Sequence, residues 1–125
     1  MRVLFTGGGT GGHIYPALAV AQRLRLEDPD AEFLFVGTRR GLEQDLVPKA
    51  GFSLETIAAA GLRRRLTLGN LNTLAQNVYG FAQALALLRR FRPDVVVGTG
   101  GYVTVPVVLA AAGLAVVSGL ARGID

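Results

Sequence analysis

The first strand-like segment of the chain leads directly into a run of glycines. Arg2 to Thr6 has the pattern of a short buried strand, and it is followed by Gly7-Gly8-Gly9-Thr10-Gly11-Gly12-His13. Apolar residues with helical spacing begin at Ile14. A tight glycine turn between a strand and a helix directs unpaired backbone N–H groups toward one point, where they bind phosphate groups. The sequence therefore predicts a phosphate-binding turn within an α/β fold.

Strand and helix patterns alternate along the rest of the chain. The predicted strands, including the first, are residues 2–6, 32–36, 53–58, 94–97 and 114–117. The predicted helices are residues 14–24, 42–50, 70–91 and 105–112. Short apolar strands separated by helices indicate a parallel sheet covered on both faces. We therefore expect residues 1–125 to form a single Rossmann-like α/β domain, with ligands bound beyond the carboxyl ends of its strands.

A second glycine turn resembles the first. Thr10-Gly11-Gly12-His13-Ile14 leads to Pro16, and Thr99-Gly100-Gly101-Tyr102-Val103 leads to Pro106. Both segments connect a predicted strand to a predicted helix. Because the carboxyl ends of parallel strands meet at one edge of a sheet, we expect the two turns to flank the same crevice.

The first turn also fits the G-x-G-x-x-G pattern of dinucleotide-binding domains. The NAD-binding form of that site carries an acidic residue at the end of the second strand, where this chain has Arg39 and Arg40. These arginines could hold a 2′-phosphate, which leaves half of an NADP-dependent oxidoreductase as an alternative. Glycines needed only for close packing of helix against strand are a further interpretation.

His13, the only histidine, stands where the first turn becomes a helix. The positive end of a helix favours a neutral imidazole, which suits a general base or a hydrogen-bond partner of a hydroxyl group. A histidine that only caps or packs against the start of the helix is the alternative. With one histidine and no cysteine, we expect no metal site and no disulfide, and a reducing compartment.

The charge pattern suggests a basic surface. The chain has 13 Lys and Arg against 9 Asp and Glu, a net charge of +4, and three arginines stand together at Arg63-Arg64-Arg65. Leucines interleave with them at Leu62, Leu66 and Leu68. Basic residues interleaved with apolar ones are typical of a segment that binds an anionic bilayer. A solvated loop is the alternative, and RNA binding is disfavoured because no aromatic stacking platform accompanies the arginines.

Neither a secretory signal nor a membrane span is evident in the sequence. The N-terminus begins directly with a strand pattern, and the longest apolar stretch, residues 103–117, is short and contains a glycine. We therefore expect a cytoplasmic protein.

The two glycine turns resemble a known family. Gly8-Gly9-Thr10-Gly11-Gly12-His13-Ile14-Tyr15-Pro16 and Gly98-Thr99-Gly100-Gly101-Tyr102-Val103-Thr104-Val105-Pro106 look like the loops of the bacterial MurG-type glycosyltransferases. That family transfers N-acetylglucosamine from UDP-N-acetylglucosamine to the undecaprenyl-linked muramoyl-pentapeptide, forming lipid II for peptidoglycan. The resemblance extends from Arg2 to about Gly113. It implies one lobe of a two-domain GT-B enzyme, the N-terminal acceptor-side domain, with the C-terminal donor-binding domain absent and the 125-residue chain inactive alone.

The resemblance also implies residue roles. The donor's sugar diphosphate would contact Thr10, Gly11 and Gly12, and His13 would be the catalytic base or would orient the acceptor hydroxyl. The acceptor pyrophosphate would contact Gly100, Gly101 and Tyr102. The membrane-facing residues would be Arg63, Arg64, Arg65, Leu66 and Leu68. The family implies no metal or other cofactor, no nucleic-acid partner, and a peripheral location on the cytoplasmic face of the plasma membrane.

Residues 114–125 depart from the family pattern. The family usually continues through a strand into a His-Glu-x-Asn segment whose asparagine contributes to the cleft, and no such segment stands between Leu114 and Asp125. Besides the transferase, two interpretations therefore stay open: the NADP-binding oxidoreductase half, and a non-catalytic module that binds pyrophosphate or phospholipid.

Overall fold

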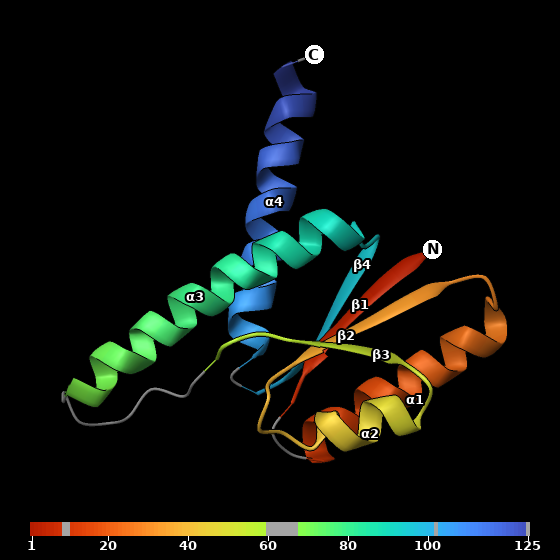
Figure 1. The fold of residues 1–125 in the computed structure, drawn as a ribbon. Coiled ribbons are helices and arrows are strands. Elements are labelled where there is room, and N and C mark those ends of the chain that lie inside the picture. Colours follow the sequence, from red (N-terminus) through yellow and green to blue (C-terminus); the bar gives the residue numbers. More distant parts are fainter. Residues whose placement is uncertain (9–10, 60–67, 102, 125) are drawn as a thin grey trace.

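Four parallel strands form the centre of the molecule (Figure 1), a computed structural model that describes residues 1–8, 11–59, 68–101 and 103–124. The strands are β1 (Arg2–Gly7), β2 (Glu32–Gly37), β3 (Ser53–Thr56) and β4 (Val95–Gly100), and their order across the sheet is β3-β2-β1-β4. All three pairs are parallel. The predicted parallel α/β sheet is therefore confirmed.

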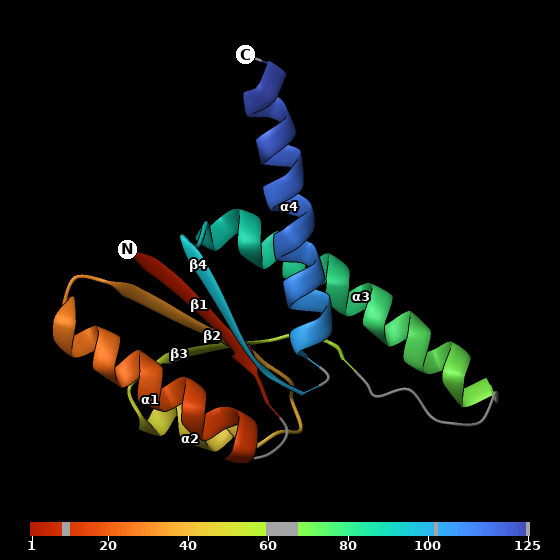
Figure 2. The same cartoon turned by 180° about the vertical axis from the view of Figure 1, so that it is seen from behind.

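Helices cover both faces of this sheet. Figures 1 and 2 show α1 (Gly11–Glu27) and α2 (Glu43–Lys49) on one face, and α3 (Leu68–Phe91) and α4 (Thr104–Ile124) on the other. The first helix begins three residues before the predicted start, so its first turn includes Gly12 and His13. The connections all run from a strand through a helix to the next strand, as parallel pairing requires.

Alternating side chains of the strands build two separate cores. In β1, Val3 and Phe5 pack with α1 and α2, while Leu4 packs with α3 and α4. Its neighbour β2 repeats the alternation in register, with Phe35 on the first face and Leu34 on the second. Because both faces are covered, apolar residues are required at successive positions, which explains the nearly continuous apolar runs.

The prediction of a fifth strand at residues 114–117 is wrong, because α4 continues through these residues without interruption. A short run of Leu, Ala and Val fits a buried strand or a helix equally well by pattern. No proline follows Pro106, and Gly113 lies in open space, so nothing local ends the helix. The distal half of α4 extends past the sheet (Figure 1), and β4 is an edge strand of the described sheet.

A groove of about 700 Å³ lies beside this edge. Its lining includes Leu88 from α3, Val96 from β4 and Val108 and Leu114 from α4, with Arg92 and Asp94 just before β4. Arg92 and Asp94 come just before the first residue of β4, so the groove lies near the amino end of this strand. The groove is therefore separate from the glycine turns, which follow the carboxyl ends of the strands.

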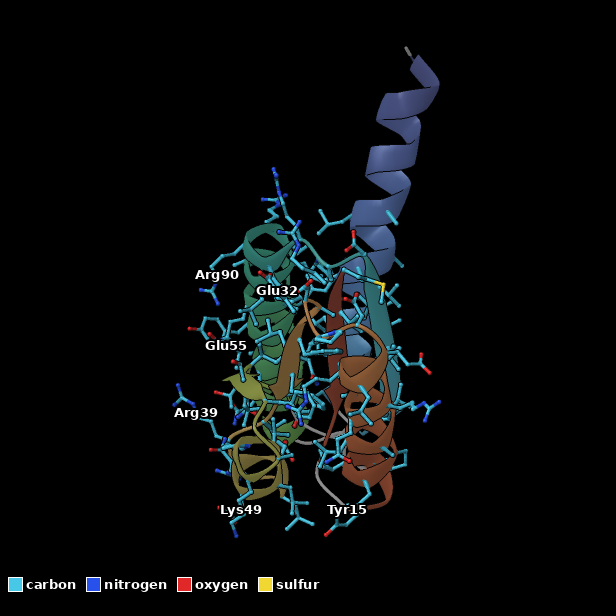
Figure 3. The ribbon with its side chains drawn as sticks, turned by 90° about the vertical axis from the view of Figure 1, so that its right-hand side faces the viewer. Tyr15, Glu32, Arg39, Lys49, Glu55 and Arg90 are labelled. Carbon is cyan, nitrogen blue, oxygen red and sulfur yellow. The ribbon has the colours of Figure 1, made fainter. Side chains whose placement is uncertain are left out.

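Helix α3 is anchored to the sheet by its second half. Gly80 passes so close to the segment after β3 that a Cβ atom would overlap the Ala58 carbonyl oxygen, and the Gln83 side chain accepts a hydrogen bond from the Ala58 N–H at 2.7 Å. Figure 3 shows the last turn of the helix joined to β3 on the outer surface, where Arg90 and Glu55 form an ion pair of 3.1 Å. The first half of α3 extends away from the sheet (Figure 1).

Replacement of Gly80 by alanine should lower the free energy of unfolding by about 1–3 kcal/mol, because the added methyl group forces α3 away from Ala58. Gly113→Ala is the matched control. Its methyl group meets nothing within 4 Å, and alanine in a helix should raise stability by up to about 1 kcal/mol. Urea denaturation followed by circular dichroism measures both values, and equal effects of the two substitutions would contradict the close contact between α3 and Ala58.

Candidate active site

The two glycine turns meet at the carboxyl ends of β1 and β4. These strands are neighbours, and Gly7 pairs with Gly100 where they end. The Gly8 N–H donates a hydrogen bond of 3.3 Å to the Gly100 carbonyl oxygen. The chain runs outward from β1 through β2 to β3 and then returns to the other side of β1 as β4, so the strand order reverses between β1 and β4. Rossmann-like sheets bind ligands at such a point. The expectation that both turns lie together is confirmed.

Two of these glycines are required by backbone conformation or close approach. Gly101 has a φ of +91°, and a Cβ atom on it would lie 2.5 Å from the Gly8 carbonyl oxygen. On the first turn, a Cβ atom at Gly7 would overlap the hydroxyl oxygen of Thr99. Any side chain at either position would push the turns apart.

Two threonine hydroxyl groups hold the second turn. The strand pairing slips by one residue after Thr6, so Thr99 is a bulged residue, and its hydroxyl group donates a 2.6 Å hydrogen bond to the His13 carbonyl oxygen. At the start of α4, the Thr104 hydroxyl group donates to the Gly100 carbonyl oxygen at 2.8 Å and accepts from the Gly100 N–H at 3.2 Å. The hydroxyl groups thus tie the second turn to both helices that leave the site.

The imidazole of His13 lies between the turns. Its Nδ1 donates a hydrogen bond of 3.0 Å to the carbonyl oxygen of Gly8. A carbonyl oxygen can only accept, so the proton of a neutral ring is on Nδ1, and Nε2 is the acceptor. A Cβ atom at Gly100 would lie 3.0 Å from Nε2, which places this nitrogen against the second turn.

Both α1 and α4 begin at this edge of the sheet (Figure 2). The first N–H groups of a helix have no partner within the helix, and they carry the positive end of its dipole. Gly11 and Gly12 supply such groups from α1, and Gly100 and Gly101 lead into the start of α4. Two helix starts beside one histidine form a site suited to an anionic ligand with a reactive hydroxyl group.

The structure brings together five of the predicted site residues, namely Gly11, Gly12, His13, Gly100 and Gly101. Thr10 and Tyr102 lie outside the described residues. The same is true of the predicted membrane-facing residues Arg63, Arg64, Arg65 and Leu66, while Leu68 is the first residue of α3. The roles of all these residues stay predictions.

The structure also describes the two arginines that follow the second strand. The side chain of Arg39, considered for a 2′-phosphate, extends into solvent (Figure 3), and Arg40 is also exposed. Within the described part of the chain, no three His, Cys, Asp or Glu side chains are grouped as metal ligands would be. None of the described helices has the length and apolar character to cross a membrane.

Sequence reasoning missed three residues of this region. Thr99 and Thr104 flank the glycines, and their hydroxyl groups fix the second turn. Glu43 is almost completely buried beneath the first turn and accepts hydrogen bonds from Thr38. The threonines could have been suspected from their repeated position beside a glycine turn. A single glutamate at the start of a short polar helix carries no such signal, because it normally faces solvent.

Comparison with known structures places the chain in the class of GT-B glycosyltransferases. Its fold matches the crystal structure of Acinetobacter baumannii MurG with a TM-score of 0.76 and 30% sequence identity, over 90% of this chain and 32% of that one. A second match, to the glycosyltransferase VinC in complex with dTDP, has a TM-score of 0.59 and 18% identity over 90% of this chain and 32% of that one, and it supports the fold alone.

Residues 3–120 match the glycosyltransferase family 28 N-terminal domain, and the chain belongs to this family. A relative from Desulforudis audaxviator is 57% identical over 112 residues, which are 90% of this chain and 30% of the relative. One from Limosilactobacillus fermentum is 54% identical over 116 residues, 93% of this chain and 32% of the relative. Both are named UDP-N-acetylglucosamine--N-acetylmuramyl-(pentapeptide) pyrophosphoryl-undecaprenol N-acetylglucosamine transferase. The chain spans about a third of the length of these relatives.

The contact between Gly7 and Thr99 can be tested by a double-mutant cycle. Gly7→Ala should destabilise the domain by about 1–3 kcal/mol, because its methyl group needs the space of the Thr99 hydroxyl group. In a Thr99→Ala background the nearest remaining contacts are ordinary, so the same change should cost at least about 1 kcal/mol less. Thermal or urea unfolding of the four proteins measures the coupling, and strictly additive effects would mean that the two turns do not constrain each other.

Proposed function

We propose that the chain is the acceptor-side, N-terminal domain of an N-acetylglucosaminyltransferase that forms lipid II in peptidoglycan synthesis. The donor is UDP-N-acetylglucosamine, and the acceptor is the undecaprenyl-linked muramoyl-pentapeptide. The observation that carries the proposal is the position of His13 between two glycine turns at the switch point of the sheet. The names of relatives more than 50% identical to this chain support the choice of substrates.

In this proposal His13 acts on the acceptor. Nε2 accepts the proton of the sugar hydroxyl group while its oxygen attacks the anomeric carbon of N-acetylglucosamine. The new glycosidic bond forms as the bond from that carbon to the diphosphate breaks, and UDP leaves with the bonding electrons. Such a direct displacement inverts the anomeric centre. The Gly8 carbonyl oxygen supports the transfer because it keeps the second ring nitrogen protonated.

The glycine turns bind the phosphate groups in this assignment. Thr10, Gly11 and Gly12, at the start of α1, receive the donor's sugar diphosphate, whose negative charge grows as UDP leaves. The turn of Gly100, Gly101 and Tyr102 binds the pyrophosphate of the acceptor at the start of α4. Most contacts to the uridine belong to a C-terminal domain, so the 125-residue chain binds its ligands without turnover.

We place the protein on the cytoplasmic face of the plasma membrane as a peripheral protein. The exposed first half of α3 supports this location, since Leu71 is 64% exposed, Leu74 56% and Val78 62%. Arg63, Arg64 and Arg65 precede this helix in the sequence. Apolar side chains next to basic ones bind an anionic bilayer through both burial and charge. A lipid-linked acceptor would reach the site from that surface.

Replacement of His13 by alanine tests the catalytic role. In an enzyme that joins this domain to the C-terminal domain of a relative, His13→Ala should lower kcat by roughly 10²–10⁴-fold, the usual contribution of a positioned base. The KM for UDP-N-acetylglucosamine should change little, because the proposed donor contacts are backbone groups. Gly11→Val should instead raise that KM first, since its side chain blocks close approach to the backbone. A His13→Ala enzyme with the kcat of the parent would overturn the assignment.

Liposome binding tests the proposed location. Changing Arg63, Arg64 and Arg65 to glutamate should abolish co-sedimentation with anionic vesicles at low salt, because the three arginines contribute roughly 3 kcal/mol in total. A variant with the same charge change at the exposed residues Arg39, Arg40 and Arg89 is the control, and it should bind more tightly than the first. Equal binding of the two variants would show that the membrane surface lies elsewhere or that only net charge matters.

A further inference from the structure

A buried carboxylate lies directly beneath the first glycine turn. Glu43 is in the first turn of α2, and it is only 1% exposed. Its Oε1 accepts a hydrogen bond of 2.7 Å from the N–H of Thr38 and one of 3.0 Å from the Thr38 hydroxyl group. A buried carboxylate costs several kcal/mol of desolvation unless hydrogen bonds compensate it. Glu43 therefore needs this local partner at the end of β2.

Three glycines close around the Glu43 side chain. A Cβ atom on Gly8 would lie 2.5 Å from Oε1, and one on Gly37 would lie 2.9 Å from the same oxygen. A Cβ atom on Gly41 would overlap the second carboxylate oxygen. The carboxylate thus occupies space that side chains at these positions would otherwise fill. It joins the end of β1, the end of β2 and the segment before α2.

Gly8 also makes the backbone contacts that orient His13 and join the two turns. The Gly8 carbonyl oxygen accepts the hydrogen bond from His13 Nδ1 at 3.0 Å, and the Gly8 N–H donates to Gly100. Gly101 also packs against the Gly8 carbonyl oxygen. Gly8 therefore lies between Glu43 and the residues of the crevice, and any shift of its peptide changes the acceptor that orients the imidazole.

We propose that Glu43 is a positioning residue for His13. Its carboxylate holds the Gly8 peptide in place, and the Gly8 carbonyl oxygen in turn keeps the proton on Nδ1 and directs Nε2 toward the second glycine turn. Glycines alone would leave this turn with many accessible conformations. The catalytic consequence rests on the proposed function, whereas the effect on the imidazole does not.

The imidazole itself provides a readout that a purely structural role would not change. In the 125-residue chain labelled with ¹⁵N, the two ring-nitrogen shifts above about pH 8 report which nitrogen of the neutral ring carries the proton. Wild-type protein should show the Nδ1–H form. Glu43→Gln, which is of equal size but removes the negative charge and replaces one carboxylate oxygen with an NH₂ group, should shift the population toward a mixture of the two tautomers in a protein that stays folded.

Asp45→Asn is the matched control, because it makes the same chemical change in the same turn of α2 at an exposed residue. It should leave the imidazole shifts unchanged. Thr38→Val is a second test variant that removes only the hydroxyl hydrogen bond to Glu43, and it should produce a smaller shift in the same direction. Unchanged shifts in folded Glu43→Gln would overturn the proposal. Unfolding of both Glu43→Gln and Thr38→Val would also overturn it, since Glu43 would then serve stability alone.

Kinetics of the two-domain enzyme separate this inference from the proposed function. Glu43→Gln should lower kcat roughly tenfold and leave the donor KM unchanged, because a small displacement of a catalytic group is costly. In a His13→Ala background the same substitution should have no further effect on kcat. A tautomer change without a loss of kcat would support the positioning of the imidazole and contradict its catalytic role. A loss of kcat that persists without His13 would contradict positioning through His13.

Discussion

The parallel pairing of β1 with β4 brings together segments that are more than 90 residues apart in the sequence, as the hydrogen bond between the Arg2 N–H and Asp94 illustrates. The contacts between the two glycine turns of the candidate site depend on this pairing. It places Gly8 beside Gly100, and it puts the bulged Thr99 within reach of the His13 carbonyl oxygen. The two helix starts then face a common point because their strands are neighbours and end at the same edge.

Much of this arrangement could be predicted from the sequence because it depends on local patterns. Apolar runs between helical segments indicate a parallel sheet, and a glycine turn between strand and helix has one common use. The contacts that complete the site are different in kind. The burial of Glu43 depends on three glycines from separate segments. No spacing in the sequence indicates that these glycines lie together around one side chain. At residues 114–117 a local pattern was misleading. Leu-Ala-Val-Val favours a strand by composition, yet these residues continue α4, because no local signal ends the helix there.

The glycines of this site and its polar side chains have complementary roles. Glycine allows close approach of backbones but brings conformational freedom that a catalytic site cannot tolerate. Polar side chains reduce this conformational freedom. The hydroxyl groups of Thr99 and Thr104 hold the second turn, and the carboxylate of Glu43 packs beneath the first. The conformation of each turn is thus fixed by polar side chains as well as by its own glycines.

The central position of β1 in the sheet also governs when the site can exist during synthesis. This strand and His13 leave the ribosome before the sheet neighbour that carries Gly100, which follows roughly 90 residues later, about 5–20 s at ordinary rates of translation. Until then one edge of β1 and its apolar side chains are uncovered, a condition that favours contact with chaperones and slow, non-local folding. A nascent chain that already contains every residue of the first turn therefore has no formed crevice, and the two turns come together only when β4 pairs with β1.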